Sequence, residues 1–289
     1  MLSIGTYLLL NQQLNIGEFI ASEIVILMII NAVSKLISSL ENFYDVITGI
    51  EKIKKITEAP TEKSGTVELS KVENGHQVEL IHLSFGFDDD QEILSNLNLK
   101  VLGGQKVCIS GPDGSGKSTL IRVLSGNYSE FSGNIMINNI PIQNYELSSF
   151  REQIGVLLVH QDIFKASLWE NIELGRQGIQ PIHAIELAKK LGFENFLEQF
   201  PQGFDTILDP MGKKIPYSNV KKILLLRALI NEPRLLLMEE PWNDLGKDLK
   251  QTVMNYILGL ENTTCIIISN NEDFAQKCDV RLNLMNGTF

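Results

Sequence analysis

One glycine-rich loop dominates the sequence: Gly111-Pro112-Asp113-Gly114-Ser115-Gly116-Lys117-Ser118-Thr119. Its spacing fits the pattern G-x-x-x-x-G-K-[ST]. Glycines let the backbone wrap closely around phosphate oxygens and point N–H groups at them, and the start of a helix adds a favourable partial charge. A strand pattern precedes the loop at residues 107–109, and a helical pattern follows it at 119–124. This context predicts a nucleotide site, with Lys117 reaching the β- and γ-phosphates and the Ser118 hydroxyl binding Mg²⁺.

A second motif lies far downstream and reads Arg234-Leu-Leu-Leu-Met-Glu239-Glu240-Pro241. An apolar run that ends in two carboxylates is typical of a buried strand that delivers acids to a nucleotide site. Taken alone, it also fits an ordinary strand end. After the glycine-rich loop, it predicts that Glu239 holds magnesium and that Glu240 orients or deprotonates the attacking water.

The first sixty residues differ in character from the rest. Residues 19–37 are mostly apolar and about long enough to cross a bilayer core, although Glu23, Asn31 and Lys35 interrupt them. Apolar residues then recur at the helical period, so residues 18–57 are expected to form one helix of about 60 Å. Ala59-Pro60 is expected to end it. A membrane helix and an amphipathic or coiled-coil arm both remain open.

Residues 4–10 are apolar but too short to span a membrane. They are expected to be the tail of a longer segment, joined to the next helix by a turn at residues 11–17. On this interpretation the chain begins inside a membrane domain. A single complete span cannot form a translocation path.

Strand and helix patterns alternate after a polar linker at residues 61–75. The expected strands lie at 78–87, 93–101, 105–110, 234–238, 264–269 and 281–285, with a hairpin at 135–140 whose turn is Asn138-Asn139. Helical patterns fill residues 167–200. Strands separated by helices predict a largely parallel sheet with its ligand chemistry at the carboxyl edge.

These motifs together resemble the ATP-binding domain of ABC transporters over residues 77–288, and residues 4–60 resemble the end of an exporter's membrane domain. The resemblance implies an α/β P-loop NTPase fold of ABC type: a RecA-like mixed-sheet core, an antiparallel β subdomain and a helical subdomain at about 165–232, after an α-helical transmembrane segment. It divides the chain into a membrane remnant (1–60), a linker (61–76) and the ATP-binding domain (77–289).

The same resemblance implies ATP and Mg²⁺ as cofactors. The implied partners are a transporter membrane domain, a second ATP-binding domain and the membrane itself, with no nucleic acid. The implied location is the cell (inner) membrane, with the ATP-binding domain in the cytoplasm.

Further site residues follow from the family pattern. Phe87 occupies the place of the aromatic residue that stacks on adenine, although it also fits a core aromatic of a strand. Gln161 matches the glutamine that senses magnesium, and residues 168–172 match the segment that faces the membrane helices. Asn270 stands where the family has a histidine. An amide can hydrogen-bond to phosphate but cannot change charge near neutral pH.

The family signature L-S-G-G-Q is badly altered. Counting back from Arg227-Ala228-Leu229, its positions hold Ile215-Pro216-Tyr217-Ser218-Asn219. In the family this segment contacts the γ-phosphate of an ATP bound by the partner subunit. Pro216 lacks both the hydroxyl and the backbone donor, and Tyr217 puts a ring where close backbone approach is needed. The first acid is also Glu239, where the family usually has aspartate.

Composition narrows the remaining hypotheses. The net charge of −10 argues against a general nucleic-acid binder. Cys108, Cys265 and Cys278 show no C-x-x-C spacing and are expected to be buried, reduced thiols. The hypotheses are an exporter's ATP-binding half with slow hydrolysis, a nucleotide-binding regulatory subunit that does not turn over, and a truncated transporter copy. A soluble ATPase acting on nucleic acid or ribosomes is a fourth. The transported substrate does not follow from the sequence.

Overall fold

The computed structural model describes residues 2–11, 13, 15–58, 61–87, 92–210 and 215–289. The chain forms two compact units, Met1–Glu62 and Lys63–Phe289. The helix end predicted at Ala59-Pro60 lies outside the described residues, as does part of the turn predicted at 11–17.

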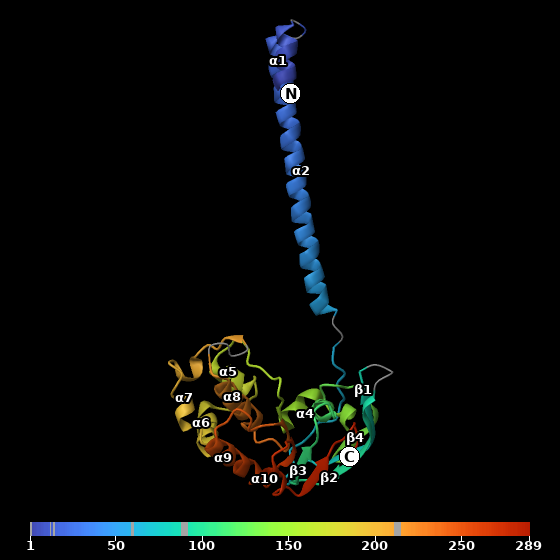
Figure 1. The fold of residues 1–289 in the computed structure, drawn as a ribbon, viewed down its shortest axis with the longest axis vertical. Helices are drawn as coiled ribbons and strands as arrows, with labels where there is room; N and C mark the ends of the chain where they lie inside the picture. The colour runs from blue at the N-terminus through green and yellow to red at the C-terminus, as the bar shows by residue number, and fades with distance from the viewer. Residues whose placement is uncertain (1, 12, 14, 59–60, 88–91, 211–214) are drawn as a thin grey trace. The chain divides into compact units, whose positions relative to one another are not determined.

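The first unit is a pair of helices, α1 (Leu2–Leu10) and α2 (Ile16–Thr57) (Figure 1). The two pack so closely that a Cβ added at Gly5 would lie 2.3 Å from the Phe19 ring. Asn15 caps the start of α2: its side chain accepts the Glu18 N–H, and the Glu18 carboxylate accepts the Asn15 N–H. None of the residues of α2 is buried, so its long apolar surface needs an apolar environment from elsewhere.

The second unit contains two sheets. The antiparallel sheet has the order β2-β1-β4-β5, and all the neighbouring strands of the other sheet, β6-β7-β8-β3-β9, are parallel. The strands are β1 (Val78–Gly86), β2 (Glu92–Val101), β3 (Lys106–Ser110), β4 (Ser132–Ile137), β5 (Ile140–Pro141), β6 (Ile154–Leu157), β7 (Leu235–Glu239), β8 (Thr264–Ile268) and β9 (Val280–Asn283). Each strand predicted from the sequence is present to within a few residues, whereas β6 was not predicted.

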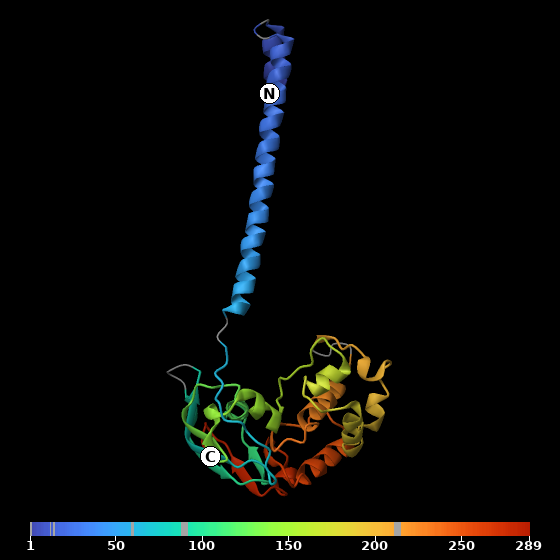
Figure 2. The same ribbon diagram turned by 180° about the vertical axis from the view of Figure 1, so that it is seen from behind.

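Helices cover the parallel sheet and build a separate helical end (Figures 1 and 2). They are α3 (Lys117–Leu124), α4 (Leu147–Gln153), α5 (Leu168–Glu173), α6 (Pro181–Lys190), α7 (Glu194–Leu197), α8 (Tyr217–Leu229), α9 (Lys247–Leu258) and α10 (Glu272–Ala275), with short 3-10 turns at η1 (Ile142–Asn144) and η2 (Gly203–Asp205). Helices α5 to α8 lie together in both views, within the range expected for the helical subdomain.

The parallel sheet separates two hydrophobic clusters. Along β7, Leu236 and Met238 pack in the cluster that contains the helices α5 to α9, while Leu235 and Leu237 pack in the cluster shared with the antiparallel sheet. Successive side chains of a strand point to opposite faces. Because both faces are covered, the strand is apolar throughout, as its sequence indicates.

Two local predictions have clear outcomes. The turn between β4 and β5 is formed by Asn138 and Asn139 with φ of 48° and 65°, the left-handed conformation that tight hairpin turns need. Part of the expected linker instead packs on the second unit. The Leu69 side chain is buried there, and the Leu69 N–H donates to Ser149 Oγ at 3.0 Å.

Candidate functional site

The glycine-rich loop connects β3 to α3, as the sequence predicts. Gly111, Gly114 and Gly116 have φ of 150°, 79° and 96°, conformations that L side chains rarely adopt. At Gly111 an added Cβ would also lie 2.3 Å from the Leu284 carbonyl oxygen. The Lys117 Nζ donates to the carbonyl oxygens of Gly111 at 2.8 Å and Pro112 at 2.7 Å. The loop is therefore a tight turn that closes around the lysine ammonium group.

The loop retains an unused polar group. Ser115 is buried, and its Oγ has no hydrogen-bond partner among the described residues. Buried polar atoms are normally paired, so an orphaned hydroxyl in a phosphate-loop pattern fits a site that accepts a polar ligand. Asp113 and Thr119, the other loop residues of the pattern, lie in the turn and in the first turn of α3.

The predicted magnesium residues follow three strands of the parallel sheet: Ser118 in α3 after β3, Gln161 after β6 and Glu239 at the end of β7. Glu239 ends β7, and Ser118 Oγ donates a hydrogen bond to Glu239 Oε1. The other oxygen, Glu239 Oε2, accepts the Val159 N–H at 3.2 Å, just after β6. Gln161 follows in the same loop, where its Oε1 accepts the Leu158 N–H at 3.3 Å. Ser118 and Glu239 are thus in direct contact, with Gln161 on the neighbouring loop.

The donor set suits magnesium. No three His, Cys, Asp or Glu side chains gather as a metal cage in the part of the chain that the structure describes. Mg²⁺ is usually held by one or two protein oxygens, with water and phosphate oxygens completing its coordination. A serine hydroxyl, one carboxylate and a nearby amide match that requirement.

The predicted base and the residue at the histidine position lie together. The Glu240 carboxylate accepts hydrogen bonds from Ser269 Oγ and from the Asn270 N–H, both at 3.1 Å. Asn270 Oδ1 in turn accepts the Gly111 N–H at 3.2 Å. Glu240, Asn270 and the phosphate loop therefore form one connected cluster. Ser269 and Trp242, which join this cluster, were not predicted, because each lies beside a motif residue without belonging to any spacing pattern.

Phe87 stands apart from the core. The ring is 59% exposed and contacts Phe85 and Tyr128 edge to face, with centroids 5.2 and 5.4 Å apart. Phe85 is the buried aromatic residue of β1. The core alternative for Phe87 is therefore wrong, because more than half of its side-chain surface faces solvent.

The segment expected at the place of the signature, residues 215–219, leads into helix α8. Pro216 is its N-cap and makes no side-chain capping hydrogen bond. Tyr217 is exposed and its hydroxyl donates to the Val159 carbonyl oxygen at 3.4 Å, within the same chain. Asn219 is buried and donates to Gln199 Oε1 at 3.0 Å. A proline and an exposed tyrosine ring therefore stand at the start of α8.

Helix α8 carries two buried basic residues, Lys221 and Arg227. Burial lowers the pKa of Lys221, while the carboxylates of Asp244, Glu240 and Glu239 oppose that shift. Burial also lowers the pKa of Arg227 to about 10. Arg227 Nη1 donates to the Asp162 carbonyl oxygen at 3.1 Å and so braces the loop that carries Gln161. The sequence placed Arg227 on this helix without indicating that contact.

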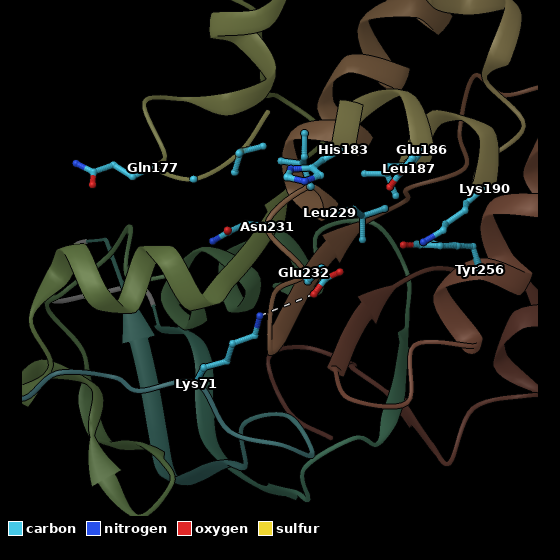
Figure 3. A pocket seen from close by; sticks show the side chains of 13 residues that line it. Lys71, Gln177, His183, Glu186, Leu187, Lys190, Leu229, Asn231, Glu232 and Tyr256 are labelled. Atoms are coloured by element: carbon cyan, nitrogen blue, oxygen red, sulfur yellow. Dashed lines mark ion pairs between the residues drawn. The ribbon is translucent and has the colours of Figure 1, made fainter. Parts of the chain in front are cut away.

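A separate cavity of about 340 Å³ is lined by residues 229–232, which come shortly before β7 (Figure 3). His183 and Lys190 of α6 line it, together with Tyr256 of α9. Lys71 and Glu232 form an ion pair of 3.8 Å across it, drawn as a dashed line in Figure 3. None of the predicted site residues lines this cavity.

A parallel sheet with a phosphate loop at its carboxyl edge defines a P-loop nucleotide-binding domain. Residues 94–243 match the family model described as "ABC transporter". The chain therefore belongs to the ABC transporter family, and the matched region is its ATP-binding domain.

Several curated relatives match nearly the whole length of this chain. The chain is 27% identical over 268 residues to the uncharacterized ABC transporter ATP-binding protein YwjA of Bacillus subtilis, covering 92% of this chain and 47% of YwjA. It is 27% identical over 286 residues to the alpha-hemolysin translocation protein HlyB of Escherichia coli O157:H7, covering 98% and 40%. It is 25% identical over 287 residues to the ATP-dependent lipid A-core flippase of Syntrophus aciditrophicus, covering 98% and 47%. The chain spans less than half the length of each of these relatives.

Among solved structures, a bacterial Atm1-family ABC exporter with ATP bound is similar. Its TM-score is 0.75 at 26% identity, and the match covers 84% of this chain and 43% of that exporter. Helix α2 is long and apolar enough to cross a membrane, and within the described residues it is the one helix that meets this test.

Proposed function

We propose that this chain is the ATP-binding half of an exporter-type ABC transporter, in which Mg-ATP closes two such domains and closure moves the membrane helices. The contact between Ser118 and Glu239 beside the Lys117 loop carries the proposal, because it joins the three groups that a magnesium–nucleotide site requires. The similarity to exporters and the apolar helix α2 support the membrane setting.

Each residue has one task on this proposal. The backbone N–H groups of the loop and Lys117 bind the phosphates, and Phe87 packs on the adenine ring. Ser118, Glu239 and Gln161 hold Mg²⁺, which supplies positive charge to offset that of the phosphates. Glu240 orients the attacking water, and Asn270 donates to phosphate without changing charge.

A second candidate is a nucleotide-binding regulatory subunit that hydrolyses little ATP. Pro216 and Tyr217 favour it, because Pro216 lacks the hydroxyl and the backbone donor of the family signature and the Tyr217 ring prevents close backbone approach. On either candidate the chain binds Mg-ATP in the same loop.

Binding of a fluorescent ATP analogue to the full chain in detergent, with Mg²⁺ present, tests the common step. Lys117→Ala removes the ammonium group that faces the phosphates and is expected to weaken binding at least tenfold, because a charge-assisted hydrogen bond contributes roughly 1.5–3 kcal/mol. Lys189→Ala, on the exposed surface of α6, is the matched control and is expected to bind as the wild type does. Equal binding by wild type and Lys117→Ala would contradict the proposed site.

A further inference from the structure

A directed chain of hydrogen bonds runs from a buried indole to the carboxylate of Glu240. Trp242 Nε1–H donates to Ser269 Oγ at 3.1 Å, and Ser269 Oγ donates to Glu240 Oε2 at 3.1 Å. Trp242 and Ser269 are both buried, and the indole also packs against the Phe274 ring with centroids 4.6 Å apart. The indole is held in place by packing, so its N–H is a fixed donor.

The direction of these hydrogen bonds follows from the number of hydrogen bonds that the Ser269 hydroxyl can accept and donate. Ser269 Oγ also accepts the Asn271 N–H at 3.1 Å. A serine hydroxyl has two acceptor positions and a single donor. Trp242 and Asn271 occupy the two acceptor positions, so the Ser269 proton is left for Glu240 Oε2.

The other oxygen of Glu240 is bound by the loop that follows β8 and contains Ser269 and Asn270. Glu240 Oε1 accepts the Asn270 N–H at 3.1 Å, and the Glu240 N–H donates to the Ile268 carbonyl oxygen at 2.9 Å. The loop itself is tied to β3, because the Ser269 N–H donates to the Ile109 carbonyl oxygen at 3.0 Å. Each oxygen of the Glu240 carboxylate thus accepts one hydrogen bond from the loop and can accept another from a further donor.

We propose that Ser269 and Trp242 are positioning residues that fix the orientation of the Glu240 carboxylate for the water that attacks ATP. The inference rests on the proposed function, in which Glu240 orients that water. A base works best when a third group holds it in the productive geometry and packing holds that group in turn. Ser269 is the third group here, and Trp242 keeps the Ser269 hydroxyl directed.

Single-turnover hydrolysis by the full chain in detergent, with protein in excess over ATP, tests this role. Ser269→Ala is expected to lower the rate roughly tenfold, and Trp242→Phe roughly threefold, with binding of the ATP analogue unchanged. Ser269→Thr keeps the hydroxyl and is expected to restore the rate. Ser149→Ala is the matched control, since it also removes a buried hydroxyl but one that bonds to Glu146 and Leu69.

The indole provides an independent spectroscopic readout. The chain has two tryptophans, so Trp169→Phe leaves the emission of Trp242 alone. Adding Ser269→Ala is expected to shift that emission to shorter wavelength, because the indole N–H loses its acceptor, and Ser269→Thr is expected to reverse the shift.

A Ser269→Ala rate equal to or above that of the wild type, at equal ATP binding, would overturn the proposal. An unshifted Trp242 emission would overturn it as well. Failure of the proposed function has a different signature: the wild-type chain then binds no ATP analogue, while the emission shift still decides whether Ser269 bonds to the indole.

Discussion

His76 is a fully buried histidine whose surroundings oppose protonation. Burial, followed by the charge of Arg234, lowers its pKa from 6.5 to about 4. Asn138 Oδ1 accepts the Gln77 N–H, so the Asn138 amide group donates to His76 Nδ1 at 2.9 Å. The ring proton therefore lies on Nε2, which has no partner among the described residues. A second proton on this ring would add a charge in a site built for the neutral form.

The stability of the second unit is expected to fall on acidification through this residue. Between pH 6.5 and about 4 the unfolded chain binds a proton at His76 that the folded chain does not. This contribution is complete above pH 6.5 and is lost as the pH falls toward 4, by at most about 3 kcal/mol. The free energy of unfolding, measured with urea at pH values from 4.5 to 7.5, should depend less on pH in His76→Gln than in the wild type. In His160→Gln, a change at an exposed position, the free energy of unfolding should depend on pH as it does in the wild type. The same pH dependence of the free energy of unfolding in the wild type, His76→Gln and His160→Gln would contradict the prediction.

At the scale of the element, α2 exposes large apolar side chains from one end to the other. Large apolar residues such as Leu27, Ile30, Ile53 and Ile56 are exposed along its whole length, and none of its residues is buried. Such a surface is covered either by lipid or by other helices. The periodic apolar pattern predicted one long helix, but it could not choose between these two coverings.

Charge substitution separates the membrane helix from the coiled-coil arm. The double change Leu27→Asp and Ile30→Asp is expected to release the chain from membranes on carbonate extraction, since each Asp at the centre of a spanning helix costs about 2.5–3.5 kcal/mol. The same change at Ile53 and Ile56, beyond the most apolar stretch, is the control and is expected to leave the chain in the membrane pellet. A wild-type chain recovered in the carbonate supernatant would favour the arm.

At the scale of the whole molecule, the proposed function gives this chain two contributions to nucleotide binding, and they are unequal. The phosphate loop and its acids form a connected cluster within the chain, whereas helix α8 offers a partner Pro216 and Tyr217. Two identical chains would each bring a complete loop and an impaired signature. On the proposed function, ATP is therefore held well by each chain and only weakly draws two copies together.

Restoring the signature chemistry is expected to strengthen ATP-dependent pairing. Pro216→Ser with Tyr217→Gly, in a Glu240→Gln background that prevents turnover, adds a hydroxyl, a backbone donor and room for close approach. One charge-assisted hydrogen bond corresponds to about tenfold in affinity. Energy transfer between two labelled copies in nanodiscs, with and without Mg-ATP, measures the change. Adding Lys117→Ala should abolish it. If the restored chain pairs no better than its parent, the assignment of residues 215–219 to the signature is wrong.

The backbone of the site was largely predictable, because the residue types in its motifs restrict the local backbone conformation. The glycine loop requires positive φ, the apolar run before Glu239 requires a strand covered on both faces, and Asn138-Asn139 favours a tight hairpin turn. Strand β6 was not predicted because it is short and mostly buried on both faces, so its sequence does not alternate, whereas the equally short β9 alternates between more and less exposed residues. The segment at 65–69 was expected to be linker, and its packing depends on Tyr145 and Ser149, far away in sequence.

The sequence by itself determined the P-loop fold, the family and the turn geometry of the glycine-rich loop, because these depend on local conformation and on periodic burial. The tertiary structure decided which motif residues touch. It joined Ser118 to Glu239, tied Asn270 to Gly111, and turned the Ser269 hydroxyl toward Glu240. These contacts join residues that are distant in the chain and depend on side-chain rotamers, and neither property leaves a period or a spacing in the sequence.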